Sequence, residues 1–579
     1  MRILLLTHAF NGLAQRLYVE LTGRGHAVSV EFDIADSVTR EAVDLFRPDL
    51  LVAPFLKRAI PEDVWRRLPC LVVHPGIRGD RGPSALDWAL REGERAWGVT
   101  LLQANAEMDA GDVWASESFP MRQAAKSSLY RREVTEAATR CVLAAVAHAQ
   151  DASFRPGPVD PADPAIRGRL RPLMRQADRT IDWAADDTAT VLAKIHAADG
   201  HPGVVDEVEG LRCRLFGGWL EPQPPRAGRP GELLATRNGA ILRATRDGAA
   251  WISHLKAETG APAIKLPAAW VLGDRLRATA EWPVALDAPP DAGGFRELLY
   301  FERGPVGFLS FDFHNGAMST SQCRRLAAAL QTVRARPTRV LVLLGGTEFW
   351  SNGIHLGTIE AAPNPADESW ENINAIDDVC LEILSFKDKI TVSALRGNGG
   401  AGGAFLALTA DEVWAREGVI LNPHYKNMGN LYGSEYWTYL LPRRVGDDGV
   451  RRVMGNRLPI GARQAAALGL VDAVLDADAA TLTEAVTERA LGIATADDFH
   501  ARLAARNARR DADESARPLA ACRAAELERM RLNFYGFDPS YHVARHRFIY
   551  RTPHSWTPRH LAIHRHVRGR PPNSSISEF

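Results

Sequence analysis

The chain has 579 residues, of which 46% are hydrophobic and 24% charged, an ordinary composition for a globular protein. This length exceeds a single core and, at roughly 100–200 residues per domain, indicates about three or four domains. Lys+Arg and Asp+Glu both count 70, so bulk charge gives no reason to expect nucleic acid or a membrane surface as a partner. No apolar run is long enough for a membrane span or a signal peptide.

The cysteines point to a reducing compartment. None of the six forms a CxxC pair, which argues against both a disulfide framework and a cysteine zinc site. The histidines likewise show no metal-ligand spacing, so we expect no metal. We therefore expect a cytoplasmic location.

The first part of the chain alternates short apolar runs with amphipathic stretches. We predict strands at 2–6, 26–32, 50–55, 70–75 and 97–102, with helices at 15–24 and 85–92. Strands that alternate with helices are typical of a doubly wound parallel sheet, whose binding sites lie at the carboxyl ends of the strands. No GxGxxG follows the first strand, so a dinucleotide site there has little support.

Two Pro-, Gly- and Asp-rich segments, 155–164 and 286–294, read as linkers. Between them, a helical stretch at 187–198 and four short strand-like runs separated by glycine turns predict a small β-rich, OB-like domain. A new α/β pattern covers 298–474, and the remainder is helical and Arg-rich. The fold class is therefore α/β multidomain, and the expected domains are 1–160, 161–285, 295–495 and a helical extension at 496–579.

The first candidate site combines His74 with Asp109. His74 follows a predicted strand, and the next strand leads into the turn that contains Asp109. A carboxylate that orients an imidazole creates an acid/base unit able to donate a proton to a leaving amine. A loop histidine and a turn aspartate with purely structural roles are the alternative.

The motifs around this pair resemble the 10-formyltetrahydrofolate-dependent formyltransferases and hydrolases, which include methionyl-tRNA formyltransferase. The resemblance is carried by His74-Pro75-Gly76, Asp87-Trp88-Ala89, Gly98-Val99-Thr100, Met108 to Asp112, and Ile181-Asp182-Trp183. It implies that 10-formyltetrahydrofolate binds near Ala53, Pro54 and Met108. It also implies that His74 stabilises the tetrahedral intermediate and that Asp109 assists proton transfer.

One position departs from the family pattern. The family has Asn-x-His, with the Asn amide donating to the developing oxyanion, and Val72 stands at that position here. Loss of one such donor typically costs about 2.7–4 kcal/mol of barrier. Either Ser84 or a backbone amide replaces the donor, or the acceptor is unusually reactive, as a thiolate would be.

The second candidate site lies at two glycine-containing turns after the predicted strands at 340–344 and 390–395. Such turns let backbone amides converge on an anion. A phosphate-binding loop lacks the GK[ST] ending, and glycines used for packing alone are the other alternative. The two turns, 349–354 and 400–403, together with 465–471, resemble the crotonase (enoyl-CoA hydratase/isomerase) superfamily with its ββα spiral. This resemblance implies an oxyanion hole for a coenzyme A thioester at the amides of Ile354 and Gly402, with the Asn352 carbonyl near the adenine.

The catalytic acids of a hydratase are missing, because Phe405 and His424 occupy their positions. Addition of water to an enoyl thioester is therefore not expected. Among the remaining polar residues we select Tyr425 and Glu435 as the acid/base pair. Glu435 precedes an apolar, aromatic run that would desolvate it and raise its pKa. A helix-starting glutamate that faces solvent is the alternative.

The segment 541–570 is rich in Arg, His and aromatic residues and has no acidic residue. Arg545 is selected there as a contact for the coenzyme A phosphates, with packing or a charged surface as the alternative. The balanced charge of the chain weakens a nucleic-acid role.

The order of the two resemblances, formyltransferase followed by crotonase, is similar to that of [NiFe]-hydrogenase maturation proteins. This resemblance implies that formyl passes from 10-formyltetrahydrofolate to coenzyme A and that formyl-CoA is decarbonylated to carbon monoxide for the hydrogenase iron. It also makes other hydrogenase maturation proteins candidate partners. Two other functions stay open: a hydrolase that releases formate under control of a regulatory coenzyme A site, and a non-catalytic carrier of a ligand.

Overall fold

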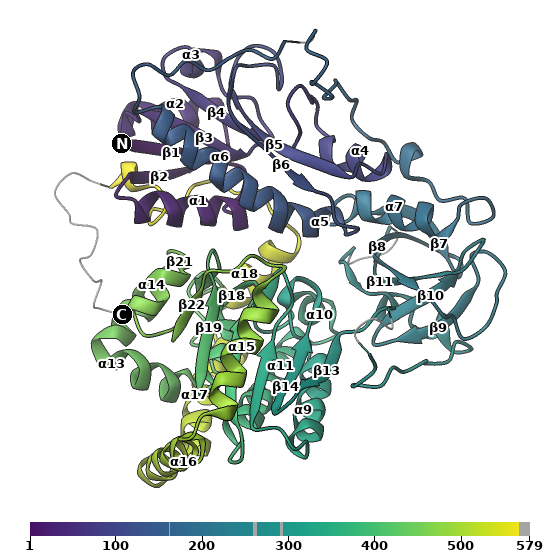
Figure 1. Cartoon of the computed structure of the whole chain (residues 1–579), viewed down its shortest axis with the longest axis vertical. Helices are drawn as coiled ribbons and strands as arrows, with labels where there is room; N and C mark the ends of the chain where they lie inside the picture. Colours follow the sequence, from purple (N-terminus) through teal and green to yellow (C-terminus); the bar gives the residue numbers. More distant parts are fainter. Residues whose placement is uncertain (161, 259–262, 290–292, 567–579) are drawn as a thin grey trace. The chain divides into compact units, whose positions relative to one another are not determined.

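A computed structural model describes residues 1–160, 162–258, 263–289 and 293–566 (Figure 1). The chain forms two compact units. Unit 1 consists of Met1–Thr180, Ala193–Val204 and the chain from Pro553, and unit 2 consists of Ile181–Leu192 and Val205–Thr552. The α/β multidomain class expected from the sequence is confirmed.

Unit 1 is built on a six-stranded sheet of order β2-β1-β3-β4-β5-β6. Its strands are β1 (Arg2–Thr7), β2 (Ala27–Phe32), β3 (Leu50–Phe55), β4 (Cys70–His74), β5 (Ala96–Gln103) and β6 (Val113–Pro120). Its helices are α1 (Gly12–Gly23), α2 (Asp36–Phe46), α3 (Glu62–Trp65), α4 (Ala85–Arg91), α5 (Lys126–Leu129) and α6 (Thr135–His148), the last continuing a π-helical turn at Tyr130–Val134. Strands β1 and β3 are almost continuously buried, as expected for parallel strands covered on both faces.

The sheet of this unit is parallel over four strands only, which corrects part of the expectation of a parallel sheet. Strands β1 to β4 pair in parallel, but β5 pairs antiparallel with β4, and β6 antiparallel with β5. Helix α4 connects β4 to β5, but this connection is not a crossover of the kind that would make the two strands parallel. Helices α1 and α6 pack against each other over this sheet (Figure 1).

The chain from Pro553 to His566, which we call the tail strap, belongs to unit 1. Its Leu561 carbonyl accepts the Val30 amide at 3.0 Å, so the strap covers β2 at the edge of the sheet. The carboxylate of Glu31 is fully buried there and binds His564 and Arg565 at 2.9 and 2.7 Å. Of the C-terminal extension expected at 496–579, the structure thus places 553–566 in unit 1, because Glu31 gives this basic segment a buried partner in the first sheet.

The small domain of unit 2 contains a sheet of order β7-β8-β11-β10-β9, with β12 beside β11. Its elements are β7 (Val204–Val208), β8 (Leu211–Glu221), β9 (Leu233–Arg237), β10 (Ala240–Ala244), β11 (Ala249–Ala257), β12 (Leu266–Pro267) and α8 (Ala268–Leu272). Helix α7 (Thr188–Ala198) precedes this sheet and is divided between the two units, since its residues from Ala193 belong to unit 1. The β-rich expectation is confirmed. Part of the second predicted linker, 290–292, lies outside the described residues.

The rest of unit 2 contains two further sheets. The larger has the order β13-β14-β15-β17-β19-β22, and the smaller has the order β16-β18-β20-β21. The strands are β13 (Leu298–Arg303), β14 (Val306–Phe311), β15 (Val340–Leu344), β16 (Phe349–Ser351), β17 (Ile390–Leu395), β18 (Asn398–Gly400), β19 (Glu412–Arg416), β20 (Ile420–Asn422), β21 (Ile460–Gly461) and β22 (Ala473–Leu475). Each turn that follows β15 and β17 adds a strand to the smaller sheet, which brings the two glycine turns together.

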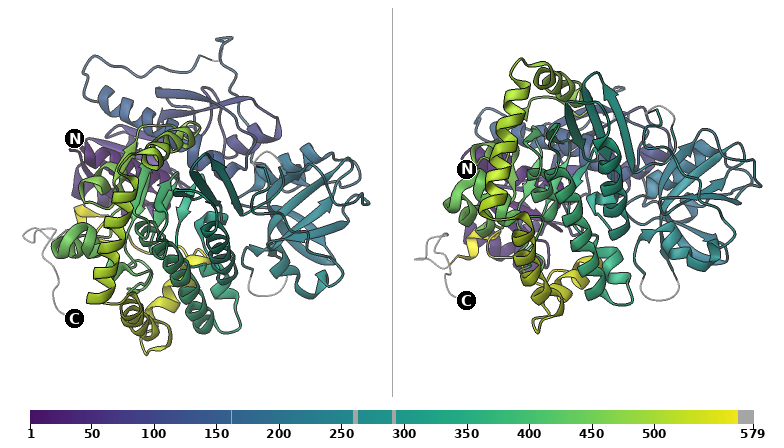
Figure 2. Two further views of the ribbon diagram at one scale, coloured as in Figure 1. Left: turned by 60° about the horizontal axis from the view of Figure 1, so that its bottom comes forward. Right: turned by 90° about the horizontal axis from the view of Figure 1, so that it is seen from below.

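Helices surround these sheets and continue beyond them. They are α9 (Thr320–Arg334), α10 (Leu356–Ala361), α11 (Pro365–Leu384), α12 (Gly402–Leu408), α13 (Trp437–Gly455), α14 (Ala462–Ala467), α15 (Leu482–Thr495), α16 (Phe499–Ala516), α17 (Leu519–Tyr535) and α18 (Ser540–Ile549). The long helices α15 to α17 appear in yellow-green in Figure 2. Helix α11 begins at Pro365 after an Asn364 cap whose side chain accepts two backbone amides.

Candidate active sites

In unit 1, His74 lies between two carboxylates at the end of β4. Its Nε2 is 2.9 Å from Oδ2 of Asp80, and its Nδ1 is 3.5 Å from Oδ2 of Asp109. The side chains of His74 and Asp80 are buried. The structure thus brings the predicted pair together and adds a second carboxylate that our sequence reasoning did not select.

Asp109 reaches His74 by a route that the sequence did not indicate. Because β5 is antiparallel to β4, its last residue, Gln103, pairs with Leu71 near the start of β4. The following loop returns toward His74, and Asp109 adopts a left-handed φ of 54° within it. Its carboxylate accepts the Gly82 amide at 3.1 Å, which fixes the loop.

Asp80 is held by Arg171, a residue from the segment after the first linker. The guanidinium of Arg171 forms an ion pair with Asp80 and a second one with Glu92 at 2.7 Å, and it lies over the ring of Trp97. The backbone of 169–171 pairs with Arg81. Because Arg171 lies 91 residues from Asp80 in the sequence, no local pattern could reveal the pair.

Because Gly76 has no side chain, there is room beside it for the imidazole of His74. A Cβ atom at this position would lie 2.3 Å from Nε2 of His74 and 2.6 Å from Oδ2 of Asp80. A side chain cannot be accommodated without moving the pair. The His-Pro-Gly motif therefore has a steric basis.

The other predicted folate contacts flank this pair. Ala53 and Pro54 are buried at the end of β3, and Ala53 pairs with Val72. Met108 is 66% exposed in the loop that carries Asp109. Ser84 is buried, and its hydroxyl oxygen accepts the Met174 amide at 3.1 Å, so the hydroxyl already has a structural contact.

In unit 2, the two glycine turns meet as predicted. Gly353 has a left-handed φ of 77°, and a Cβ atom built on it would lie 3.2 Å from the Gly402 nitrogen. The amide of Gly402 is the first of helix α12, where amides lack an acceptor within the helix. The Ile354 amide donates no hydrogen bond to another described residue. Both amides named for the oxyanion hole are thus available as donors.

Glu435 lies directly against this pair of turns. A Cβ atom on Gly402 would be 1.9 Å from Oε1 of Glu435, so the carboxyl group contacts the glycine backbone. Oε2 accepts the Tyr425 hydroxyl at 2.5 Å and the Ser434 amide at 3.1 Å. Burial raises the pKa of Glu435 to about 7 and the pKa of Tyr425 well above its usual value. Glu435 does not face solvent, since only 1% of it is exposed.

Aromatic packing replaces the hydratase acids near this carboxyl group. The ring of Phe405 stacks on that of Tyr425, with 5.3 Å between centroids and 15° between planes. His424 is buried. A water molecule for hydration would lack a carboxylate at the position of Phe405.

The two predicted coenzyme A contacts differ in exposure. Asn352 is exposed, and its Nδ2 donates to the Asn315 carbonyl at 2.8 Å. Arg545 is only 4% exposed, and its Nε binds Glu360 at 2.7 Å. A guanidinium held in this way by a carboxylate is not presented to a phosphate.

Within residues 1–160, 162–258, 263–289 and 293–566, no group of three or more His, Cys, Asp and Glu side chains is placed to hold a metal ion. In the same described ranges, no helix is long and apolar enough to cross a membrane.

Comparison with known proteins matches the three parts of the fold to three family models. Residues 31–146 match formyl transferase, 173–264 match the formyl transferase C-terminal domain, and 312–556 match enoyl-CoA hydratase/isomerase. Methionyl-tRNA formyltransferase of Ralstonia nicotianae is 25% identical over 224 residues, which are 38% of this chain and 67% of that protein. The chain therefore joins formyltransferase-type domains to an enoyl-CoA hydratase-like, crotonase-type domain, and these domain types imply enzymatic activity.

Two relatives that match over the full length show which family within this class the chain belongs to. Hydrogenase maturation factor HoxX of Bradyrhizobium diazoefficiens is 54% identical over 581 residues, which cover all of both chains. The crystal structure of HypX from Aquifex aeolicus in complex with tetrahydrofolic acid is 49% identical, with a TM-score of 0.95 over 99% of this chain and 100% of that one. The chain belongs to the HoxX/HypX family of hydrogenase maturation factors.

Proposed function

We propose that the chain transfers formyl from 10-formyltetrahydrofolate to coenzyme A and then converts the formyl thioester to carbon monoxide and free coenzyme A. Formyl transfer is assigned to residues 1–180, which hold His74, and the thioester step to the crotonase-like part, 295–552, which holds Glu435. The carbon monoxide would serve as the ligand of the [NiFe]-hydrogenase iron, with hydrogenase maturation proteins as recipients.

The six cysteines are buried and form no disulfides, which fits a reducing cytoplasm as the location of the protein.

The formyl-transfer step rests on His74 and its two carboxylates. An imidazole held at both nitrogens can receive a proton on one side and release it on the other without rotating. The structure with tetrahydrofolic acid named above supports folate as the donor for this chain. Val72 removes the side-chain donor of the formyltransferases, which favours a thiolate over an amine as acceptor because a thiolate is the stronger nucleophile.

The observation that carries the second step is the contact of the Glu435 carboxyl with Gly402. Formation of carbon monoxide from a formyl thioester breaks the C–H and C–S bonds. The carbon keeps the C–H electron pair, the sulfur keeps the C–S pair, and the proton moves from carbon to sulfur. No oxidant or reductant is needed.

The residues present fit this proton transfer. A carboxyl group whose pKa lies near 7 can both accept and return a proton at neutral pH. The amides of Ile354 and Gly402 would donate to the thioester oxygen, where negative charge develops. The Tyr425 hydroxyl donates to Oε2 of Glu435, so Oε1 is the carboxyl oxygen that lies on the side of Gly402.

The test uses purified protein, 10-formyltetrahydrofolate labelled with 13C in the formyl group, and coenzyme A. We expect labelled carbon monoxide that requires coenzyme A. Labelled formate formed equally well without coenzyme A would show a hydrolase instead, and neither product would show a ligand carrier.

Two variants separate the steps. His74→Ala should abolish consumption of the formyl donor. Glu435→Gln should consume the donor once and form the thioester, but yield no carbon monoxide. Glu528→Gln, an exposed glutamate on α17, is the matched control and should behave as wild type.

A further inference from the structure

Helix α11 supplies fully buried polar side chains to the first glycine turn and to the turn that carries Glu435. Asn372 accepts the His355 amide at 3.0 Å and donates to the Met318 carbonyl at 2.8 Å, which fixes the first turn. Asp377, further along the helix, contacts the turn that carries Glu435. Sequence reasoning selected neither residue.

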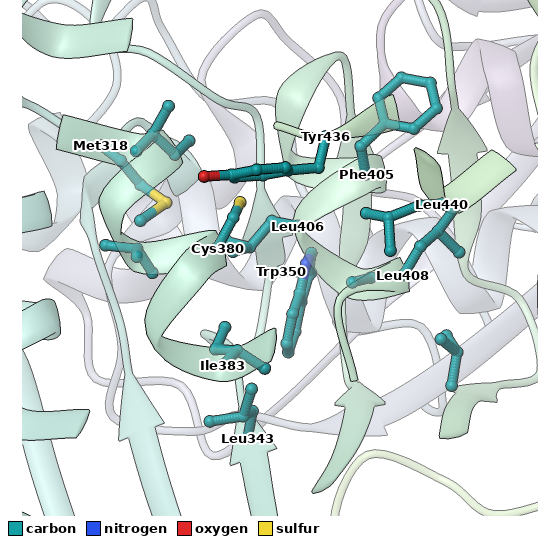
Figure 3. Close-up of a cluster of buried hydrophobic side chains, with 14 of the residues drawn as sticks. Met318, Leu343, Trp350, Cys380, Ile383, Phe405, Leu406, Leu408, Tyr436 and Leu440 are labelled. Carbon is teal, nitrogen blue, oxygen red and sulfur yellow. The ribbon is translucent and has the colours of Figure 1, made fainter. Parts of the chain in front are cut away.

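The turn that carries Glu435 has an unfavourable backbone conformation. Glu435 and Tyr436 both have positive φ, 61° and 58°, which is rare for residues with side chains. Such a conformation persists only where surrounding contacts fix it. On one side, the ring of Tyr436 is anchored in the hydrophobic cluster beside Cys380 and Leu406 (Figure 3).

On the other side, Asp377 holds the turn through both of its oxygens. Oδ1 accepts the Glu435 amide at 2.8 Å, and Oδ2 lies 2.8 Å from the Ser434 hydroxyl. The same hydroxyl lies 3.2 Å from Oε2 of Glu526. Asp377, Ser434 and Glu526 are all fully buried.

The hydroxyl of Ser434 faces two carboxyl groups but has a single hydrogen. One of the two carboxyl groups must therefore supply a proton of its own. Glu526 also accepts the amides of Tyr436 and Thr438 and the Thr438 hydroxyl, at 3.0, 2.8 and 2.6 Å. Burial raises the pKa of Glu526, but these three further donors act in the opposite direction and favour its ionised form over that of Asp377, which accepts a single amide. The proton is thus on Asp377, which donates to Ser434, which donates to Glu526.

One cation lies near this group. Arg523 approaches Oδ2 of Asp377 at 3.7 Å, but it pairs more closely, at 2.7 Å, with Asp378, which is exposed. Burial raises the pKa of Asp377 well above its usual value, with the neighbouring charges of Glu435 and Glu526 acting in the same direction. The hydrogen-bond geometry and the burial therefore both indicate that the carboxyl group of Asp377 is protonated.

We propose that Asp377 is a positioning residue: its neutral carboxyl group holds the turn of Ser434, Glu435 and Tyr436 so that Glu435 lies against Gly402. The inference rests on the role proposed above for Glu435. A neutral Asp377 fixes the turn without adding a negative charge beside Glu435. Glu435, which also faces Tyr425, Glu526 and the thiol of Cys323, can then still ionise near neutral pH.

The activity test compares two substitutions. Asp377→Asn keeps an acceptor for the Glu435 amide and a donor for the Ser434 hydroxyl, so carbon monoxide output and its pH midpoint should stay close to wild type. Asp377→Ala removes both contacts and should lower the output about 100-fold, the effect of a misplacement of about 1 Å. Consumption of the formyl donor in the first turnover should persist in both.

Glu371→Ala, which removes an exposed carboxylate from the same helix, is the matched control and should leave the output unchanged. If Asp377→Ala keeps full output, or if Asp377→Asn loses as much as Asp377→Ala or moves the pH midpoint, the inference is wrong. Should the alanine variant fail to fold, the asparagine variant and its pH profile alone decide.

An infrared measurement tests the neutral carboxyl group without reference to turnover. The difference spectrum of wild type minus Asp377→Asn at pH 7 should contain the carbonyl stretch of a protonated carboxylic acid. A carboxylate band in its place would overturn the inference. A wild-type protein that forms no carbon monoxide would refute the proposed function, while this spectrum would still decide the protonation of Asp377.

Discussion

Replacement of Glu435 by Gln should make the protein more stable at alkaline pH while it abolishes carbon monoxide output. The glutamine has nearly the same shape as a protonated glutamate and can accept the Tyr425 hydroxyl and the Ser434 amide through its carbonyl oxygen. It cannot ionise. The variant therefore isolates the free-energy cost of a buried negative charge at this position.

The size of the effect follows from the pKa of Glu435. The difference between the usual 4.5 and about 7 corresponds to about 3 kcal/mol. Because the folded-state pKa lies above the unfolded value, the folded protein binds more protons between these pH values, and its free energy of unfolding falls as pH rises through this window. The cost is absent below about pH 4.5 and complete above about pH 7.

Scanning calorimetry at pH 5 and pH 8 measures this difference. We expect similar Tm values for the crotonase-like part of the two proteins at pH 5. At pH 8 the Tm of the variant should be higher than that of the wild type by about 6–12 °C, since 1 kcal/mol shifts the Tm of a domain of this size by about 2–4 °C. Glu528→Gln corrects for the loss of an exposed charge. A Tm difference that does not change between the two pH values would refute a buried, titrating Glu435.

Three further changes test the geometry of the two sites. Gly402→Ala places a Cβ atom 1.9 Å from the Glu435 carboxyl and should lower labelled carbon monoxide at least about 100-fold, with thioester formation retained. Gly76→Ala places a Cβ atom 2.3 Å from the His74 imidazole and should instead slow consumption of the formyl donor, measured in a single turnover. Removal of the tail strap exposes the edge of β2 and the buried Glu31, so hydrogen exchange of β2 should increase while exchange of β17 stays unchanged.

The sequence predicted the parts of the fold that follow from local patterns. The buried runs of β1, β3 and β15 and the glycine turns before α12 all lie where they were expected. The direction of β5 was not predictable in the same way, since an apolar run of this length is compatible with either orientation. Asp109 nevertheless reaches His74, because its loop compensates for the reversed strand.

The unpredicted site residues share one property: their partners are distant in the sequence. Asp80 is bound by Arg171, and Asp377 contacts Glu435, 58 residues away. Outside the sites, Glu31 is bound by the tail strap in the same way, so in each case a buried charge or carboxyl group has a partner that no local motif specifies. A motif can identify the residue at the centre of a candidate site, as it identified His74, which lies between Asp80 and Asp109. The groups that fix such a residue in place become visible only when burial shows which charges need a partner.

The same reasoning explains why Glu435 was selected while Asp377 was not. Glu435 stands beside aromatic residues, so its desolvation was visible in the sequence, whereas Asp377 lies in an amphipathic helix among exposed acidic neighbours. Only the fold shows that Asp377 is fully buried and Asp378 exposed. Because the cost of burying an ionised carboxyl is large, its burial there implies a specific contact, and the contact found is the amide of Glu435. On the proposal made here for Asp377, the backbone conformation that positions the Glu435 carboxyl depends on a residue whose own charge is suppressed.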